Sequence, residues 1–433
     1  MSTAPPANHS MLRAFRYPKF TATFAAGFVS QLGDWMQIFA RSVLAYQLTG
    51  KAESVGIIYF ASYVPQLLFS VWGGVLADRF DRRKLFVGTQ VAEAAGAAGI
   101  GVLVATGTVN VFNLAVLSFL IGIAFMLAIP AGSALAPAVV PPEALTSAIS
   151  WSTATNSICR VLGPLLAAGA VAAFGGTQWV FWINTLSFAG VIAVWLVIKI
   201  PTTSGAPHES TLDAMRTGIN YVRTTPAVAT PIGMSAFLNT VGVVYQPLSV
   251  VFATVVLAAG DEELGVTRNG WLQASIGLGA AIGILALARL GERRPAFTFI
   301  GSAIMFSILL TLFGLASGLW VVLGIAFVAG AFQFANITMS VNLVQHRVPE
   351  ALRGRVMSIE MLAMIGGVPI AALVGGWLAD AVGVRVVISV AGLLCLAFSL
   401  VSLRWAKHIG NAPITGLDSE SVAAVGTIID DEG

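Results

Sequence analysis

The sequence contains little charge, little cysteine and little histidine. Charged residues make up 10% of its 433 residues, whereas a soluble domain has roughly 25%. The two cysteines, Cys159 and Cys395, lie inside apolar runs without a CxxC spacing, so they indicate neither a disulfide framework nor a metal site. The four histidines are dispersed, and the chain has no phosphate-binding P-loop and no HExxH string. We therefore expect no enzyme, no metal, no cofactor and no ATP-driven reaction.

Long apolar runs are abundant, since 57% of the residues are hydrophobic. A helix needs about 20 apolar residues to cross a bilayer, and twelve runs of the sequence are long enough. The first run contains Asp34 and Arg41, unlike the uncharged core of a signal peptide, so it is interpreted as a retained span. The predicted class is an all-α membrane protein. The runs cover roughly 20–47, 54–77, 84–106, 110–136, 146–173, 177–198, 226–258, 269–291, 296–316, 319–345, 353–378 and 383–405.

A polar break divides these runs into two groups of six. The predicted organisation is a cytoplasmic segment at 1–19, a six-helix bundle at 20–198, a cytoplasmic linker at 199–225, a second six-helix bundle at 226–405 and a disordered cytoplasmic tail at 406–433. In the linker, Ser210 and Asp213 form a capping box, and Leu212, Met215, Ile219 and Val222 share a helical face. This pattern predicts a short amphipathic helix on the cytoplasmic surface; the alternative is a plain linker.

The distribution of Lys and Arg predicts the orientation. If both termini are cytoplasmic, eighteen of the 23 basic residues fall in inner segments. Only Lys51, Arg268 and Arg385 fall in outer turns, and Arg41 and Arg160 lie within spans. Such a bias follows the positive-inside rule, and it predicts a multi-pass protein of the plasma (inner) membrane.

Two internal repeats support the division into halves. VPPEAL at 140–145 recurs as VPEAL at 348–352, and GGVLAD at 73–78 recurs as GGWLAD at 375–380. Nested repeats of this kind place a substrate path between the halves, near the bilayer midplane.

Five ionisable residues fall within predicted spans, where each costs at least about 2.5 kcal/mol at the bilayer centre. We therefore expect them to face a protein-lined or watery interior. They are Asp34, Arg41, Glu93, Arg160 and Glu360.

The first span carries a polar stripe, because Gln31, Asp34, Gln37 and Arg41 share about a third of the helix circumference. Asp34 and Arg41 are about 10 Å apart along the axis, too far to pair directly. Each is expected to find a partner on another helix, with Glu93 and Arg160 as candidates. A carboxylate held in this way can exchange protons; the alternative is a permanent ion pair that only joins helices.

Further polar residues complete the expected cavity, and Trp35 and Tyr245 are candidate aromatic walls. Charge in one half and amides in the other suit a bulky amphipathic solute better than a sugar. For Glu360, near the cytoplasmic mouth, a gate or scaffold contact is favoured over substrate binding. The uncharged polar candidates are Asn156 on the fifth span, Asn239 and Gln246 on the seventh, and Gln333 and Asn336 on the tenth.

The loop after the second run is short and strongly basic. Its sequence, GGVLADRFDRRKLF at 73–86, predicts either a charged turn that serves only orientation or a gate in which a carboxylate faces arginines. It resembles the signature loop of the major facilitator superfamily, with Asp81 where the family prefers glycine. The resemblance implies a gating role for Gly74, Asp78, Arg79, Arg82 and Arg83.

The fifth span adds a second resemblance. Its Gly163-Pro164 pair resembles the fifth-helix motif of superfamily exporters, although Cys159, Ala167 and Ala168 replace glycines. The alternative is small-residue helix packing.

Several stretches resemble the branch of this superfamily that contains enterobactin exporters, macrolide-efflux proteins and transmembrane secretion effectors. They include QLGDWMQ at 31–37, LAPAVVPPEALTSAI at 135–149 and PEALRGRVMS at 349–358. The resemblance implies twelve transmembrane helices in two pseudo-symmetric bundles and transport by rocking of the halves.

The leading hypothesis is a monomeric, proton-coupled exporter of small amphipathic compounds such as drugs or siderophores. Its expected partners are a small-molecule substrate, protons and membrane lipid, with no nucleic acid. An uncoupled facilitator or lysolipid flippase is the first alternative, and a membrane receptor without transport is the second.

Overall fold

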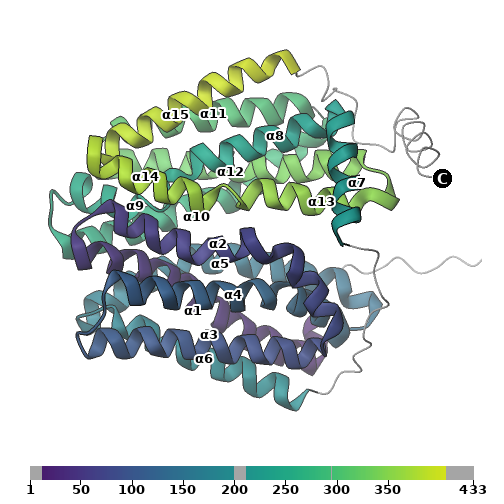
Figure 1. The fold of residues 1–433 in the computed structure, drawn as a ribbon, viewed down its shortest axis with the longest axis horizontal. Coiled ribbons are helices and arrows are strands. Elements are labelled where there is room, and N and C mark those ends of the chain that lie inside the picture. Colours follow the sequence, from purple (N-terminus) through teal and green to yellow (C-terminus); the bar gives the residue numbers. More distant parts are fainter. Residues whose placement is uncertain (1–11, 199–210, 294, 406–433) are drawn as a thin grey trace, which may run out of the picture. The chain divides into compact units, whose positions relative to one another are not determined.

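The computed structural model describes residues 12–198, 211–293 and 295–405, and throughout them the secondary structure is helical, without strands (Figure 1). The side chains of 70–79, 211–214 and 287–293, and those of 134, 136, 137 and 285, lie outside the described set. The predicted tail at 406–433, and Ser210 and the side chain of Asp213 from the predicted capping box, therefore lie outside the described residues.

The first six long helices correspond to the first six predicted spans. They are α1 (Pro18–Thr49), α2 (Ala52–Arg79), α3 (Arg82–Ala105), α4 (Val111–Leu135), α5 (Pro142–Phe174) and α6 (Gln178–Val197).

Nine further α-helices follow within residues 211–293 and 295–405. They are α7 (Thr211–Thr224), α8 (Pro226–Val241), α9 (Ser249–Phe252), α10 (Glu262–Arg293), α11 (Pro295–Leu315), α12 (Leu319–Arg347), α13 (Glu350–Ile365), α14 (Val368–Val382) and α15 (Val384–Val401). Short 3-10 helices occupy Arg13–Arg16, Ala136–Val139, Gly242–Tyr245 and Ser402–Trp405, and a π-helical turn occupies Ala253–Leu257.

Twelve helical stretches account for the twelve predicted spans. In the described residues, nine stretches are long and apolar enough to cross a bilayer. The other three, α1, α2 and α10, contain 32, 28 and 32 residues. At 1.5 Å per residue each exceeds the roughly 30 Å of a hydrocarbon core. The predicted all-α membrane class is confirmed.

Two spans are broken where the sequence predicts continuous helices. The seventh passes from α8 through a 3-10 turn to α9, and the eleventh is divided into α13 and α14 at Gly366 and Gly367. A Cβ at Gly367 would overlap the hydroxyl of Thr240 on α8, so the break allows these two spans to approach closely. In the seventh span Pro247 has no N–H to donate to a regular helix.

Charged residues at helix ends satisfy backbone groups that the helices leave unpaired. Asp81 caps α3, because its carboxylate accepts hydrogen bonds from the N–H groups of Arg83 (2.9 Å) and Lys84 (3.0 Å). Arg83 in turn donates to the carbonyls of Trp195 and Leu196 at the end of α6, both at 2.5 Å. The charged residues of this loop thus fix two helix ends.

Close packing divides the chain into two compact units. Unit 1 comprises Met1–Ala40, Phe69–Val109 and Leu120–Ala206, and unit 2 comprises Arg41–Leu68, Asn110–Phe119 and Pro207–Gly433. The boundary therefore passes through α1, α2 and α4, whereas the predicted halves meet only at the linker. The division into two six-helix halves stays a prediction.

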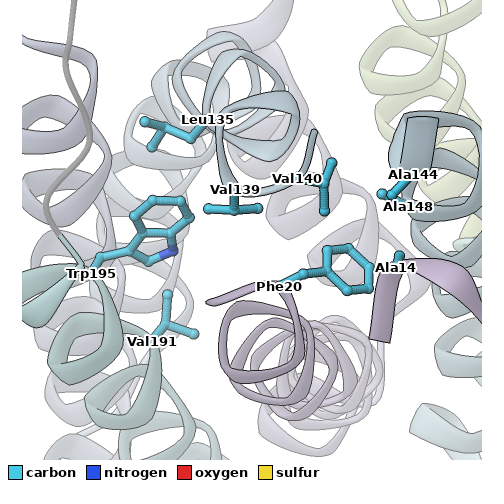
Figure 2. Close-up of a cluster of buried hydrophobic side chains, with 9 residues drawn as sticks. All are labelled: Ala14, Phe20, Leu135, Val139, Val140, Ala144, Ala148, Val191 and Trp195. Atoms are coloured by element: carbon cyan, nitrogen blue, oxygen red, sulfur yellow. The ribbon is translucent and has the colours of Figure 1, made fainter. Parts of the chain in front are cut away.

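One hydrophobic core of unit 1 joins the start of α1 to the end of α4, the start of α5 and the end of α6 (Figure 2). The indole of Trp195 also contacts Phe86 edge-on, with the ring centroids 5.8 Å apart. This packing adjoins the cap that Arg83 provides. The core residues are Ala14, Phe20, Leu135, Val139, Val140, Ala144, Ala148, Val191 and Trp195.

In unit 2, helix α7 occupies part of the predicted linker and packs against α8 and α13 (Figure 1). Tyr221 is completely buried there, and its hydroxyl donates to the carbonyl of Arg347 at 3.4 Å. Burial raises the pKa of the Tyr221 phenol above its ordinary value. Gly218 lies against Ile359, which allows the close approach of α7 to α13.

Candidate functional site

In unit 1 the polar stripe of α1 meets α6. Gln37 is buried, and Gln31 and Asp34 are half-buried. Gly33, also on α1, lies against the side chain of Asn184 on α6, and a Cβ at Gly33 would overlap its amide oxygen. The missing side chain at Gly33 therefore makes room for an amide beside Asp34.

Asn184 is the centre of this polar network. It is completely buried, and its Nδ2 donates to Asp34 Oδ1 at 3.4 Å and to Gln37 Oε1. Ser187 Oγ donates to Asn184 Oδ1 at 2.9 Å. The amide is thus held at both ends. Asn184 is not among the site residues predicted from the sequence; the available signal was an amide near the middle of the mostly apolar sixth span.

Helix α5 meets α1 one residue away from Asp34. The guanidinium of Arg160 lies over the indole of Trp35, 4.9 Å from the ring centroid, which is a cation–π distance. Gly163 packs directly on Trp35, and a Cβ there would overlap the Trp35 side chain. Pro164 is buried. Gly163, which belongs to the motif that resembles the fifth helix of exporters, therefore packs on the same Trp35 side chain that Arg160 covers.

Two further candidates in unit 1 lie on α3 and α5. Glu93 is 3% exposed, and its Oε1 accepts a hydrogen bond from Gln90 Nε2 on the same helix at 3.5 Å. Asn156 is half-buried on α5.

Arg41 belongs to unit 2, although it shares α1 with Asp34. It is 8% exposed, and its Nη1 donates to Ser62 Oγ on α2 at 3.3 Å. Ser62 in turn donates to the carbonyl of Ile58 at 2.7 Å. A hydroxyl on another helix is therefore one of the partners of Arg41, where the sequence analysis considered only charged groups.

The amide candidates of unit 2 gather around Gln333 on α12. Its Oε1 accepts hydrogen bonds from the Tyr245 hydroxyl at 2.6 Å and from Gln246 Nε2 at 3.5 Å. Asn336, one turn along, donates to the carbonyl of Phe299 at 2.8 Å. Asn239 donates to the Ser235 carbonyl at 2.9 Å.

Three of these amides line one small cavity of about 10 Å³, room for about a single water molecule. Beside this cavity the Tyr245 hydroxyl donates its hydrogen bond to Gln333. Unit 2 thus contains a closely packed cluster of amides and apolar side chains around this cavity. The lining residues are Leu238, Asn239, Phe306, Gln333, Asn336 and Ile337.

Glu360 on α13 is completely buried in unit 2. Its Oε1 accepts a hydrogen bond from Ser340 Oγ on α12 at 2.6 Å, whereas its Oε2 has no hydrogen-bond partner among the described residues. Ser340 also lies 3.4 Å from the Pro231 carbonyl on α8. This contact joins three helices, and it favours the scaffold interpretation of Glu360.

The predicted gating loop is described only in part. The side chains of Asp78 and Arg79 and the burial of Gly74 lie outside what the structure describes, and Arg82 is half-buried. The capping bonds of Arg83 to α6 give this residue a structural task that the gating interpretation does not include.

The fold matches solved structures of transporters. One is a bacterial homolog of the human lysosomal transporter Spinster in an inward-facing, unoccupied conformation, with a TM-score of 0.72, 12% identity and coverage of 90% of this chain and 98% of that chain. Another is the nucleoside transporter NupG, with a TM-score of 0.68, 13% identity and coverage of 90% and 99%. The chain therefore has the fold of these membrane transporters, which is the major facilitator fold that its sequence predicts.

The chain belongs to the transmembrane secretion effector family, whose sequence profile matches residues 9–420. It is 26% identical over 379 residues to the enterobactin exporter EntS of Escherichia coli O1:K1 / APEC and to that of Shigella boydii serotype 18. Each alignment covers 85% of this chain and 87% of the relative. The protein is therefore an integral membrane transporter of small molecules, as the sequence analysis predicts.

Proposed function

We propose that this transporter is a proton-coupled exporter of small amphipathic compounds, in the class of drugs or siderophores, that works by alternating access. The similarity to enterobactin exporters supports the direction and the substrate class. The observation that carries the proposal is the hydrogen bond from Asn184 to the carboxylate of Asp34 at mid-span. A carboxylate at this depth is costly to insert, and such residues commonly mark substrate or proton pathways.

In this proposal Asp34 takes up a proton from the outer side and releases it to the cytoplasm. The change of charge need not move the side chain, because an amide can hydrogen-bond both to an ionised and to a protonated carboxyl. Asn184 is itself fixed by Ser187, so Asp34 keeps its place in both states. Glu93 is a second candidate carrier, since it is buried on α3.

The solute would contact two different surfaces. In unit 1 it would contact the half-buried Trp35 and Arg160, which offer an aromatic face and a positive charge. In unit 2 it would contact the amides around Gln333, where few hydrogen bonds are available in an apolar wall. Each of these surfaces favours a solute that is amphipathic and largely apolar. The cavity of about 10 Å³ must widen before such a solute enters.

Orientation and organisation are part of the proposal. Both termini face the cytoplasm, two six-helix halves rock about the substrate path, and the protein acts as a monomer in the inner membrane. Gly74, Asp78, Arg79 and Arg82 form the inner gate, while Arg83 holds α6 in place beside it.

Reconstitution tests the function directly. Proteoliposomes that contain the purified protein are loaded with a panel of catecholate siderophores and amphipathic dyes. The efflux of these compounds is measured with and without an imposed pH gradient. We expect the gradient to accelerate efflux by the wild type and not by Asp34→Asn. Equal acceleration of both proteins would remove Asp34 from coupling. Transport indifferent to the gradient would identify a facilitator or lipid flippase, and binding without flux would identify a receptor.

A further inference from the structure

The repeated GGWLAD string ends in a contact between two distant helices. Asp380, its last residue, accepts hydrogen bonds from the backbone N–H groups of Ala52 and Glu53, both at 2.8 Å. These two residues begin α2, and Asp380 lies near the end of α14, more than 300 residues later. The carboxylate thus joins the first and last thirds of the chain.

Among the described contacts, no residue directly before α2 caps its first N–H groups. The first N–H groups of a helix lack partners within it, and a side-chain oxygen on the preceding residue usually supplies one. Lys51 precedes α2, and an ammonium group has no acceptor. Thr49, two residues further back, accepts from the N–H of Lys51 and not from the helix. Asp380 therefore supplies the missing acceptors, and its charge is favourable at a helix N-terminus.

Glycines bring the same two helices into backbone contact. A Cβ at Gly376 would lie 2.6 Å from the carbonyl oxygen of Ala52, and one at Gly56 would overlap the carbonyl of Ala372. Small residues of this kind allow helices in a membrane to pack closely. We call this contact between α2 and α14 the seam. The two helices pack closely along the seam, and at its end Asp380 caps the first N–H groups of α2.

This seam joins the two predicted halves. Residues 41–68 come from the first half, yet they belong to the same compact unit as the second half. In the predicted orientation Lys51 lies in an outer turn, so the seam closes the outer side. Alternating access requires that side to open in turn, and opening must break the contact.

We propose that Asp380 is a positioning residue of the transport cycle, whose carboxylate latches α2 to α14 and so holds the outer side closed. The equivalent string GGVLAD ends at Asp78, near the opposite end of α2. Each copy of the repeated motif therefore ends in an aspartate, one that contacts the start of α2 and one whose sequence position is near its other end. The latch rests on the alternating access of the proposed function but not on proton coupling. It can therefore be tested separately from the role of Asp34.

A buried reporter thiol measures how often the seam opens. Ala52 is 1% exposed, and Ala52→Cys leaves its backbone N–H in place. The reporter is combined with Asp380→Ala or Asp380→Asn in proteoliposomes, and the rate of alkylation by a membrane-impermeant maleimide is measured. The same protein without the reporter corrects for Cys159 and Cys395, which are both buried.

We expect Asp380→Ala to raise the alkylation rate roughly two- to thirty-fold, the range that corresponds to loss of a helix cap. Asp380→Asn, which keeps one acceptor oxygen, should give a smaller increase. Asp261→Ala is the matched control, because Asp261 caps only its own helix through the N–H of Leu264 at 2.9 Å. It should leave the rate unchanged.

Wild-type alkylation rates in both Asp380 variants would overturn the latch, as would an equal rise in Asp261→Ala. The Asn variant keeps the test valid if the Ala variant does not fold. The same alkylation rates are measured in Asp34→Asn carrying the reporter, with and without the Asp380 substitutions. The Asp380 substitutions should raise the rate there as well, because loss of coupling does not remove the latch, and this separates the two proposals.

Discussion

Asn184 on α6 donates a hydrogen bond to the carboxylate of Asp34 on α1 over 3.4 Å. A neutral amide is therefore one of the groups that hold the carboxylate at the centre of the proposed mechanism. The same amide donates to Gln37, so a single residue of α6 holds two polar residues of α1.

Replacing Asn184 with Ala should destabilise the protein, because Gln37 loses its buried donor, whereas Ser187 keeps its hydrogen bond to the backbone carbonyl of residue 184. We expect the free energy of unfolding to fall by about 1–3 kcal/mol, the cost of unsatisfied buried polar groups. Thermal unfolding in detergent measures the change. Asn156→Ala, a half-buried amide on α5, is the control and should change stability little. Similar losses in both variants would contradict a special role for Asn184.

Arg160 and Trp35 should be energetically coupled. A partly desolvated cation–π contact is worth about 0.5–2 kcal/mol. A double-mutant cycle with Arg160→Gln and Trp35→Leu should therefore give an interaction free energy in that range, measured by unfolding. Trp35→Phe should retain part of the coupling. Strictly additive effects would show that the contact contributes nothing.

Glu360 should tolerate an uncharged replacement. Gln keeps the shape of the side chain and an acceptor for the Ser340 hydroxyl, so Glu360→Gln should unfold at the wild-type temperature and transport at the wild-type rate. Ser340→Ala removes the hydrogen-bond donor and should cost about 1–3 kcal/mol of stability. Loss of transport in a stable Glu360→Gln protein would instead support a gate or a proton carrier.

Asp81 and Arg83 should act on helix ends. Asp81→Ala should lower stability by about 0.5–2 kcal/mol through loss of the α3 cap, while Asp81→Asn should lose less.

Arg83→Gln should increase hydrogen exchange at the end of α6, near Trp195, because two carbonyls lose their donor. Arg82→Gln is the neighbouring control. Unchanged exchange near Trp195 in Arg83→Gln would argue against capping.

The helical class and the positions of the spans could be predicted because apolar length and charge placement are local properties. The breaks at Gly242–Tyr245 and Gly366 could not, because these depend on contacts such as that between Gly367 and Thr240. Glycine in an apolar run is equally compatible with an unbroken helix.

The hydrogen-bond partners of the candidate residues could not be predicted from the sequence. Asn239, Gln333 and Asn336 were selected singly, and the structure brings them to one cavity. Asn184 was missed, as were Ser62 and Ser340, because charged residues were considered as partners for charged residues. Buried serine and asparagine satisfy such groups without any signature in spacing, and only the helix packing identifies them.

The central claim is that Asp34 carries the proton that drives export, and substrate-dependent proton movement tests it most directly. Proteoliposomes that enclose a pH-sensitive indicator receive a transported siderophore or amphipathic dye as substrate, without an imposed gradient. The internal pH is then followed. The account predicts a pH change with the wild type and none with Asp34→Asn, although substrate still exchanges across the membrane. An undiminished pH change in Asp34→Asn would contradict it.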